Sequence, residues 1–350
     1  MNETLESTIT QHAFSDGMPA KFIELKNSYG MTVSFMDIGA TWLSCRLPLS
    51  GGEIREVLLG VGSIAQFNQH TSFMGSTVGR YANRIANGQF TISGKRYSVS
   101  RNQAGNCLHG GSQGFDKRRW EVLNQSRQQV TFALDSPDGD QGFPGNLCVS
   151  VTYTLTDTNQ VEVTYLARTD KATPVGLTNH AYFNLSAQNR DCLTHQLKID
   201  ADYYVPTNDK GIPLGELSDV SETGFDFRTS KQIGDDLLKD KQQCIAHGYD
   251  HCYLFDPKRV VSKPVLTLVA PDNLVTLSII TNKPAIQLYT GNWLEGEPNR
   301  EGGSYDQYAG VALETQFLPD SPNQREWNQP SCILEPENYY RYQTIFGFDF

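Results

Sequence analysis

Two runs of alternating side chains, joined by a polar turn, dictate antiparallel pairing in the middle of the chain. Residues 148–155 (CVSVTYTL) and residues 161–168 (VEVTYLAR) place apolar side chains at every second position, and TDTNQ connects them. Alternation with period two indicates a strand that buries one face, and the polar connection indicates a hairpin turn. Residues 120–135 and 265–281 repeat the pattern. The chain is therefore predicted to be built from antiparallel hairpins.

Further strand patterns cover much of the remaining chain, and helical periodicity is rare. Strands are expected at residues 32–39, 89–94, 195–201, 285–291, 310–317 and 339–346. Only residues 61–70 and 229–240 are expected to be helical. Short strands with Gly-, Asn- and Asp-rich connections predict an all-β fold, a large antiparallel β-sandwich with very little helix. Because no linker, low-complexity tract or repeat divides the chain, residues 1–350 are expected to form a single domain.

The charge balance and the cysteines limit the partners and the compartment. With 39 acidic against 29 basic residues, the net charge of -10 argues against nucleic acid or an anionic membrane as the partner and leaves a small neutral ligand. The chain has no apolar run of ~18 residues and no basic and apolar leader at its start. Its 7 cysteines show no C-x-x-C spacing and are expected to be reduced, so a cytoplasmic protein is predicted.

Two glycine-rich motifs suggest functions that their surroundings do not support. Gly60, Gly62 and Ala65 form a G-x-G-x-x-A pattern, but no βαβ alternation and no acidic residue follow, so a dinucleotide site is not expected. Residues 110–114 form G-x-S-x-G around Ser112. A hydrolase elbow needs a strand before it and a helix after it, whereas this motif follows a loop and leads into a strand, so a flexible loop is expected.

A third motif, His247 and His251, has the i, i+4 spacing of metal ligands on a helix. The glutamate of H-E-x-x-H is absent, and helical periodicity is weak around the pair. Two candidate ligands do not complete a coordination sphere, so a structural role is expected and no metal site is predicted.

Residues 174–185 (PVGLTNHAYFNL) are predicted to form a strand with a histidine on its polar face. The face expected to pack in the core, interrupted by Asn179, consists of Val175, Leu177, Ala181, Phe183 and Leu185. The opposite face consists of Gly176, Thr178, His180, Tyr182 and Asn184. A row of hydrogen-bonding groups that includes an imidazole titrating near neutral pH indicates a polar ligand or partner on that side.

The predicted strand 310–317 presents a carboxylate in the same way. Its apolar face consists of Val311, Leu313, Thr315 and Phe317, and its other face consists of Ala312, Glu314 and Gln316. A buried carboxylate is costly unless it is paired, so an ion pair alone would explain Glu314. With His180 across one cavity, however, Glu314 as base and His180 as acid would form a catalytic pair. The histidine is expected to hold the proton of the pair. Nearby positive charge is expected to keep the glutamate ionised.

That positive charge is expected from residues 57–115, which contain no acidic residue. Within them, Asn83 and Arg84 adjoin each other and His109 lies on a glycine-rich loop. The fixed fork of arginine and the paired donor and acceptor of asparagine suit a ligand with several hydroxyls.

Three further charged residues are less specific. Asp250 lies between aromatic residues in GYDHCYLF and is either an acceptor for sugar hydroxyls or an ordinary turn aspartate. Arg80 and Arg101 are expected to be solvated at the surface.

Taken together, these segments resemble the aldose 1-epimerases, specifically the bacterial galactose mutarotase type of that family. The matching segments lie between residues 79 and 323 and read GRYANRIANG, LHGGSQGFDKRRW, DGDQGFPGN, TNHAYFNL, GYDH and ALETQFLPDSPN. Residues 1–18 carry no part of the likeness and are treated as an N-terminal extension of undefined order.

The resemblance implies a galactose mutarotase-like supersandwich, no metal or organic cofactor, and interconversion of the α and β anomers of a free hexose such as galactose or glucose. It assigns Glu314 as the base and His180 as the acid, in agreement with the strand patterns. The residues that it implies for holding the sugar are Asn83, Arg84, His109, Asp250 and Gln287. The expected partner is a free aldohexose, bound by a monomer or homodimer that contacts neither nucleic acid nor membrane.

Two other functions remain open from the residues alone. A glycoside hydrolase would use two carboxylates, for which Asp250 and Glu314 are candidates. A sugar-binding sandwich without catalysis would keep the same contacts. The sequence does not define the preferred sugar or whether phosphorylated hexoses are accepted.

Overall fold

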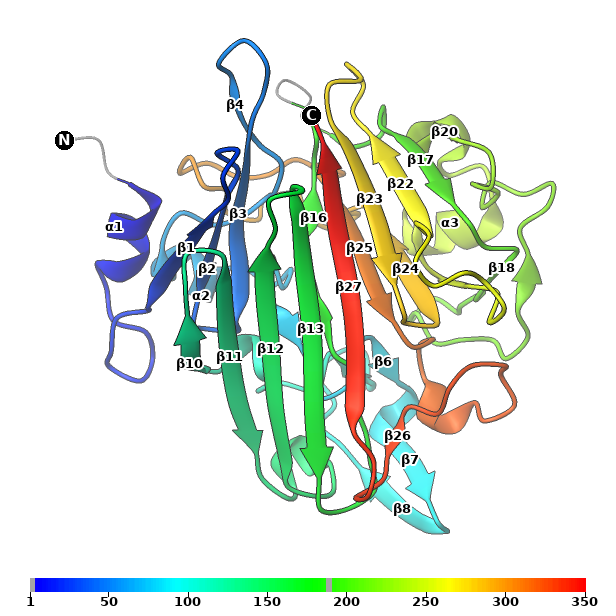
Figure 1. Ribbon diagram of the computed structural model, residues 1–350. Coiled ribbons are helices and arrows are strands. Elements are labelled where there is room, and N and C mark those ends of the chain that lie inside the picture. The colour runs from blue at the N-terminus through cyan, green and yellow to red at the C-terminus, as the bar shows by residue number, and fades with distance from the viewer. Residues whose placement is uncertain (1–3, 187–190) are drawn as a thin grey trace.

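The computed structural model describes residues 4–186 and 191–350, and strands dominate it (Figure 1). Its largest sheet is antiparallel and has the order β10 (Glu121–Gln125), β11 (Gln129–Ser136), β12 (Leu147–Leu155), β13 (Gln160–Thr169), β27 (Tyr340–Asp349), β23 (Thr276–Thr281), β22 (Leu266–Val269), β17 (Gln196–Ile199) and β20 (Lys231–Gln232). The pairs β10–β11, β12–β13 and β22–β23 confirm the three predicted hairpins. β27, from the end of the chain, fills the place between β13 and β23.

A second antiparallel sheet lies behind the first in Figure 1. Its order is β16 (Tyr182–Phe183), β25 (Val311–Gln316), β24 (Ala285–Tyr289), β21 (Asp250–Leu254), β18 (Tyr203–Tyr204) and β19 (Ser218–Asp219). Val311 and Leu313 of β25 join the large buried core. The Thr315 hydroxyl lies 2.5 Å from that of Thr344 on β27, so this face of β25 meets the first sheet. Because side chains alternate along a strand, Glu314 points to the opposite side, as predicted.

Smaller sheets complete the sandwich. A four-stranded sheet consists of β1 (Phe22–Lys26), β2 (Thr32–Met36), β3 (Thr41–Pro48) and β4 (Ile54–Glu56). Two-stranded pairs are β5 (Thr77–Val78) with β15 (Thr178–Asn179), β6 (Arg84–Ile85) with β9 (Cys107–Leu108), β7 (Gln89–Ile92) with β8 (Lys95–Ser98), and β14 (Thr173–Pro174) with β26 (Ile333–Leu334). The predicted all-β sandwich is confirmed.

The described helices are short. They are α1 (Leu5–Thr10), α2 (Ile64–Gln69) and α3 (Lys241–Ala246), with 3-10 turns η1 (Ala86–Gly88), η2 (Phe115–Lys117), η3 (Asp140–Gly142), η4 (Ile233–Asp236) and η5 (Ser321–Asn323). α2 confirms the helix predicted at 61–70. The helix predicted at 229–240 is wrong, because those residues form β20 and η4. α3 begins only after Asp240, whose side chain caps it. No helix in the described part of the chain is long and apolar enough to cross a membrane.

The prediction of one continuous strand over residues 174–185 is also wrong. The segment is broken into β14, β15 and β16, which pair with strands of three different sheets. Every one of its residues is buried, so the alternation does not separate a core face from a solvent face. Asn179, the polar interruption, donates hydrogen bonds from its amide to the Gly75 carbonyl (2.6 Å) and the Tyr153 hydroxyl (3.1 Å).

The segment before β1 is packed against the sandwich. Ile9 of α1 shares a buried cluster with Ile64 and Phe67 of α2. Arg119 forms ion pairs at 2.5 Å with both Asp16 and Asp37, which ties the segment to the body of the protein. The described part of this N-terminal extension is therefore ordered, and the single-domain organisation of residues 1–350 stays a prediction.

Candidate active site

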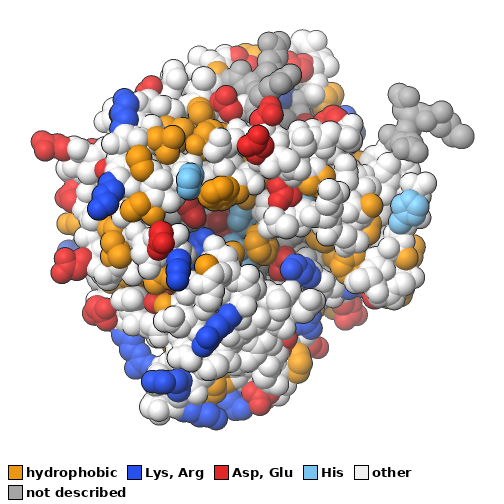
Figure 2. Space-filling view, turned by 180° about the vertical axis from the view of Figure 1, so that it is seen from behind, with side chains coloured by type: hydrophobic (Ala, Val, Ile, Leu, Met, Phe, Trp, Pro, Cys, Tyr) orange, Lys and Arg blue, Asp and Glu red, His pale blue; other side chains and the backbone are white. Residues whose placement is uncertain are grey.

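The candidate site is a pocket on the outer side of the six-stranded sheet, where Figure 2 shows a hollow containing histidine and acidic side chains. In the sheet register, Glu314 lies opposite Gln287, and Gln287 lies opposite Cys252, two residues from Asp250. Paired residues of neighbouring antiparallel strands share a face, so three strands present polar groups to the same side. The position of the site thus follows from the alternation that fills the core on the other face.

We refer to this hollow, with a volume of about 200 Å³, as the central pocket. It is lined by Thr71, Ser72, Phe73, Asn83, Arg84, Gln103, Leu108, His109, His180, Tyr182, Asp250, Tyr289, Trp293, Glu297 and Glu314. Six of the seven residues predicted for the site are therefore brought together. The seventh, Gln287, supports Asp250 from the adjacent strand.

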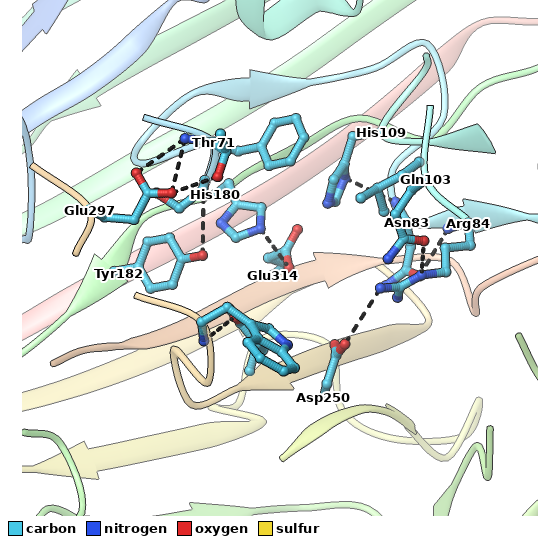
Figure 3. A pocket seen from close by; sticks show the side chains of 15 residues that line it. Thr71, Asn83, Arg84, Gln103, His109, His180, Tyr182, Asp250, Glu297 and Glu314 are labelled. Atoms are coloured by element: carbon cyan, nitrogen blue, oxygen red, sulfur yellow. Dashed lines mark hydrogen bonds and ion pairs between the residues drawn. The ribbon is translucent and has the colours of Figure 1, made fainter. Parts of the chain in front are cut away.

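Glu314 and His180 face each other at the floor of the central pocket (Figure 3). Glu314 Oε1 lies 3.5 Å from His180 Nε2, and the two residues are 3% and 4% exposed. Glu314 Oε2 and His180 Nδ1 have no hydrogen-bond partner among the described residues. A separation longer than a strong hydrogen bond of about 2.8 Å leaves both groups able to turn to oxygen atoms of a ligand.

The backbone holds His180 firmly in place although its segment is irregular. Its N–H donates to the Ser76 carbonyl, and its own carbonyl accepts from the Gly75 N–H, both at 2.9 Å. The imidazole is enclosed by rings, with centroids 5.0 Å away for Tyr182, 5.2 Å for His109 and 5.8 Å for Phe73. The histidine is thus oriented by tertiary contacts rather than by strand geometry.

Burial of this pair does not favour the protonation that the sequence predicted. Burial raises the pKa of Glu314 to about 8, with the Asp250 charge adding to the rise and Arg84 opposing it. Burial also lowers the pKa of His180 to about 4, and the Asp250 charge opposes this only in part. Both shifts favour uncharged forms, because a dry site penalises an ion. Burial therefore favours the arrangement in which the single proton of the pair lies on the glutamate.

A second polar group stands beside the pair. Asp250, the first residue of β21, accepts a hydrogen bond from Gln287 Nε2 at 2.6 Å and lies 3.7 Å from Arg84 Nη2. Arg84 Nε donates to Gln103 Oε1 at 3.0 Å. Asp250 is therefore a strand residue that faces the pocket, which resolves the open choice against a turn aspartate.

His109 presents a hydrogen-bond donor to the pocket. The Asn83 backbone N–H donates to His109 Nδ1 at 3.1 Å, so this nitrogen carries no proton and Nε2 of the neutral ring does. Ligand atoms of His109, His180 and Glu314 lie within 4.8 Å of one another, a spacing that would suit a metal ion. The His109 tautomer does not fit a metal ligand, because its remaining nitrogen bears hydrogen. The cluster suits hydroxyl and ether oxygens instead.

The rejected motifs have structural roles. His251 is buried, and its Nδ1 accepts from the Asp250 N–H at 3.1 Å, while His247 ends α3 and packs against Trp293. Ser112 lies exposed in a loop with Ser100 and Gln141, without the strand and helix of an elbow. The turn around Gly60 and Gly62 leads into α2 from an antiparallel sheet, so no dinucleotide fold surrounds it.

Arg80, predicted to be solvated, is buried instead, whereas Arg101 is exposed as predicted. The Arg80 guanidinium donates to the carbonyls of Pro144 and Gly145 and to both oxygens of Ser136, at 2.5–3.1 Å. These acceptors lie at the end of β11 and in the connection β11–β12, which Arg80 thereby holds next to the site loops.

Replacing Arg80 by methionine is expected to lower the free energy of unfolding by about 3 kcal/mol, because several buried carbonyls lose their donors. Urea unfolding measures this. The exposed Arg101→Met is the control and should change stability by no more than about 0.5 kcal/mol. Equal stability of the two variants would contradict the structural role of Arg80.

Sequence reasoning missed the residues that form the rim of the pocket. The Glu297 carboxylate accepts from the Thr71 hydroxyl at 2.6 Å and from its N–H at 3.1 Å, which joins two loops across the mouth (Figure 3). Trp293 is 66% exposed at the edge, and Gln103 positions Arg84. The length of the loops at 101–119 and 291–304 was the one sequence signal for Gln103, Trp293 and Glu297, and Thr71 had none.

The comparisons with known proteins agree with the antiparallel sandwich. A family model described as aldose 1-epimerase matches residues 21–347. The chain is 47% identical over 333 residues to an aldose 1-epimerase of Escherichia coli, covering 95% of this chain and 96% of the relative. It is 37% identical over 322 residues to a galactose mutarotase of Rattus norvegicus, covering 91% of each. The chain belongs to the aldose 1-epimerase family.

Solved structures show the same architecture. An aldose epimerase homologue from C. elegans superposes with a TM-score of 0.87 at 31% identity, covering 94% of this chain and 99% of that one. A galactose 1-epimerase from Lactobacillus acidophilus gives a TM-score of 0.83 at 29% identity, covering 97% of both chains. The protein is accordingly an isomerase of the aldose 1-epimerase type.

Proposed function

We propose that the protein interconverts the α and β anomers of free hexoses such as galactose and glucose, with Glu314 as the base and His180 as the acid. The observation that carries the proposal is the buried pair itself, with Glu314 Oε1 3.5 Å from His180 Nε2 at the floor of the central pocket. The names of the relatives, aldose 1-epimerase and galactose mutarotase, support the choice of substrate.

The reaction begins with ring opening. Glu314 takes the proton of the anomeric hydroxyl while His180 gives a proton to the ring oxygen, so that the C1–O5 bond breaks and C1 becomes an aldehyde. Before this step the pair must hold its single proton on the histidine, and after it the proton is on the glutamate. Burial therefore favours the form that follows ring opening, and the reaction shifts one proton within the pair.

Ring closure on the other face of the aldehyde completes the reaction. Rotation about the C1–C2 bond exposes the opposite face of the carbonyl, and the two residues then exchange roles. Arg84, Asp250 and the Nε2–H of His109 line the rest of the central pocket and would hold the remaining hydroxyls while C1 turns. Only protons pass between the sugar and the two residues in either step.

The rate should depend on pH as a bell between about 4 and about 8. Below the lower pKa both residues carry a proton, so no base remains. Above the upper pKa neither residue carries a proton, so no acid remains. Polarimetry of kcat/KM against pH measures both limbs. Asp250→Asn should move both limbs to lower pH, because the Asp250 charge raises the pKa of each residue. A profile without an alkaline limb would contradict the assignment.

A glycoside hydrolase is the competing function, with Asp250 and Glu314 as its two carboxyl groups. The pair of Glu314 with His180, at 3.5 Å, favours the epimerase, because it supplies an acid and a base without Asp250, which is engaged by Gln287 at 2.6 Å and by Arg84 at 3.7 Å. Polarimetry of freshly dissolved α-galactose, with chromogenic galactosides in parallel, separates the three functions. We expect accelerated mutarotation without glycoside cleavage. Cleavage of the glycoside would indicate a hydrolase, and the absence of both activities would indicate a binding protein.

The partner and compartment are also proposed from the chain. Its net charge of -10 disfavours nucleic acid and anionic lipid, which leaves the free sugar as the partner of a monomer or homodimer. The 7 cysteines lie free, as expected in the reducing cytoplasm. Sedimentation of the purified protein tests the oligomeric state, and fractionation of the cells that produce it tests the compartment.

A further inference from the structure

Phe73 occupies a special place in the wall of the central pocket. Its ring centroid lies 4.6 Å from that of His109 and 5.8 Å from that of His180, nearly parallel to the latter at 26°. Phe73 also lines a larger neighbouring hollow, the side cavity, together with Phe67, His70 and Asp116. Thr71, Gln103 and Leu108 also line both hollows, and Phe73 is the shared residue whose ring contacts His180.

The backbone at Phe73 is strained. Its φ of 58° lies in the left-handed region, which a bulky aromatic residue rarely adopts. Asn83 (φ 64°) and His109 (φ 50°) share this conformation and line the same pocket. Strained non-glycine residues persist where surrounding structure demands them, and they concentrate at functional sites. The position of the Phe73 ring is therefore a feature that the fold maintains against a local cost.

The turn that carries Phe73 is connected directly to His180. The Ser76 N–H donates to the Phe73 carbonyl at 3.0 Å, and residues 75 and 76 form the two backbone hydrogen bonds that hold His180. On the other side, the Tyr182 hydroxyl donates to the Ser72 carbonyl at 3.1 Å. Ring and histidine thus belong to one rigid unit, in which movement of the turn would reorient the imidazole.

Resting on the function proposed above, we propose that Phe73 is a positioning residue of the acid/base pair. Its ring fixes His180 toward Glu314 and keeps water of the side cavity from the imidazole. The groups that face His180 are Glu314, His109 and Tyr182, with Asp250 and His70 acting at longer range. Phe73 is the apolar member of this set, and its removal opens the imidazole to the side cavity.

Two substitutions test this role. Phe73→Gly removes the ring while relieving the left-handed backbone, and Phe73→Leu keeps an apolar side chain. We expect Phe73→Gly to lower kcat for mutarotation about 100-fold, the effect of a misplacement of about 1 Å, with KM changed less than about 3-fold. NMR should show His180 titrating about one pH unit higher, because water reaches the ring. Phe73→Leu should lower kcat less and shift the His180 titration less than Phe73→Gly does.

The control is Phe67→Leu, on another wall of the side cavity, where the ring packs against His70 with centroids 5.0 Å apart. It should leave kcat and the His180 titration unchanged, even if it costs stability. An unshifted His180 titration in Phe73→Gly would overturn the inference, whatever the rate. The NMR titration of His180 does not depend on turnover. It therefore still tests the role of Phe73 if Glu314→Gln proves active and the proposed function fails.

Discussion

Glu314→Gln should reduce kcat for mutarotation by about 10² to 10⁴, because the variant has no base for the anomeric hydroxyl. Glutamine keeps the shape of the side chain, and Glu314 Oε2 has no partner among the described residues that the change would disturb. Sugar affinity should therefore change less than about 3-fold. Polarimetry gives the rate, and isothermal titration with galactose gives the affinity.

The matched control for this variant is Glu121→Gln, an exposed position at the start of β10. It removes the same charge far from the central pocket and should retain the full rate. Full activity of Glu314→Gln would remove the glutamate from the mechanism. Loss of affinity together with the rate would instead make Glu314 a binding residue.

His180→Asn should lower kcat to a similar extent, by about 10² to 10⁴, because the ring oxygen loses its proton donor. The shape of the pH profile is the sharper measurement. With the histidine absent, activity depends only on ionisation of Glu314, so the bell should become a rise through the pKa of the glutamate, which burial places at about 8. The residual rate should not fall again at higher pH.

For this variant His12→Asn is the control, since His12 is exposed near the N-terminus. Its profile should match that of the unaltered protein. A bell-shaped profile with a normal kcat in His180→Asn, accompanied only by a raised KM, would reduce His180 to a contact with the sugar.

Patterns confined to one strand were predictable from the sequence. The alternation along residues 310–317 placed Leu313 in the core and Glu314 on the opposite face, and the structure has β25 in that arrangement. The three hairpins were predictable for the same reason, since their partners are neighbours in the chain. Local periodicity carries this information because side-chain direction in a strand depends on position alone.

Features that depend on distant segments were not predictable. Residues 174–185 alternate as a strand would, but loops cover both sides and divide the segment among three sheets. Arg80 is buried because carbonyls 56 to 65 residues away converge on it. The contact of Thr71 with Glu297 joins positions 226 residues apart. No pattern within either of the two segments predicts such a contact.

The proton distribution of the acid/base pair failed for a related reason. Sequence reasoning placed opposite charges next to each other and inferred an ion pair. The structure buries both groups, and the loss of hydration destabilises each ion by more than the attraction of its neighbour stabilises it. The pKa of Glu314 therefore rises to about 8 and that of His180 falls to about 4. Burial of His180 at this level depends on rings such as Phe73 and His109, which belong to other segments.

A crystal structure of Glu314→Gln with galactose would show where both residues lie relative to the sugar, because the variant should bind the sugar without turning it over. We expect the side chain at position 314 within about 3.2 Å of the anomeric oxygen and a nitrogen of His180 within the same distance of the ring oxygen. A sugar bound in the side cavity, or with its anomeric carbon directed away from both residues, would contradict the account.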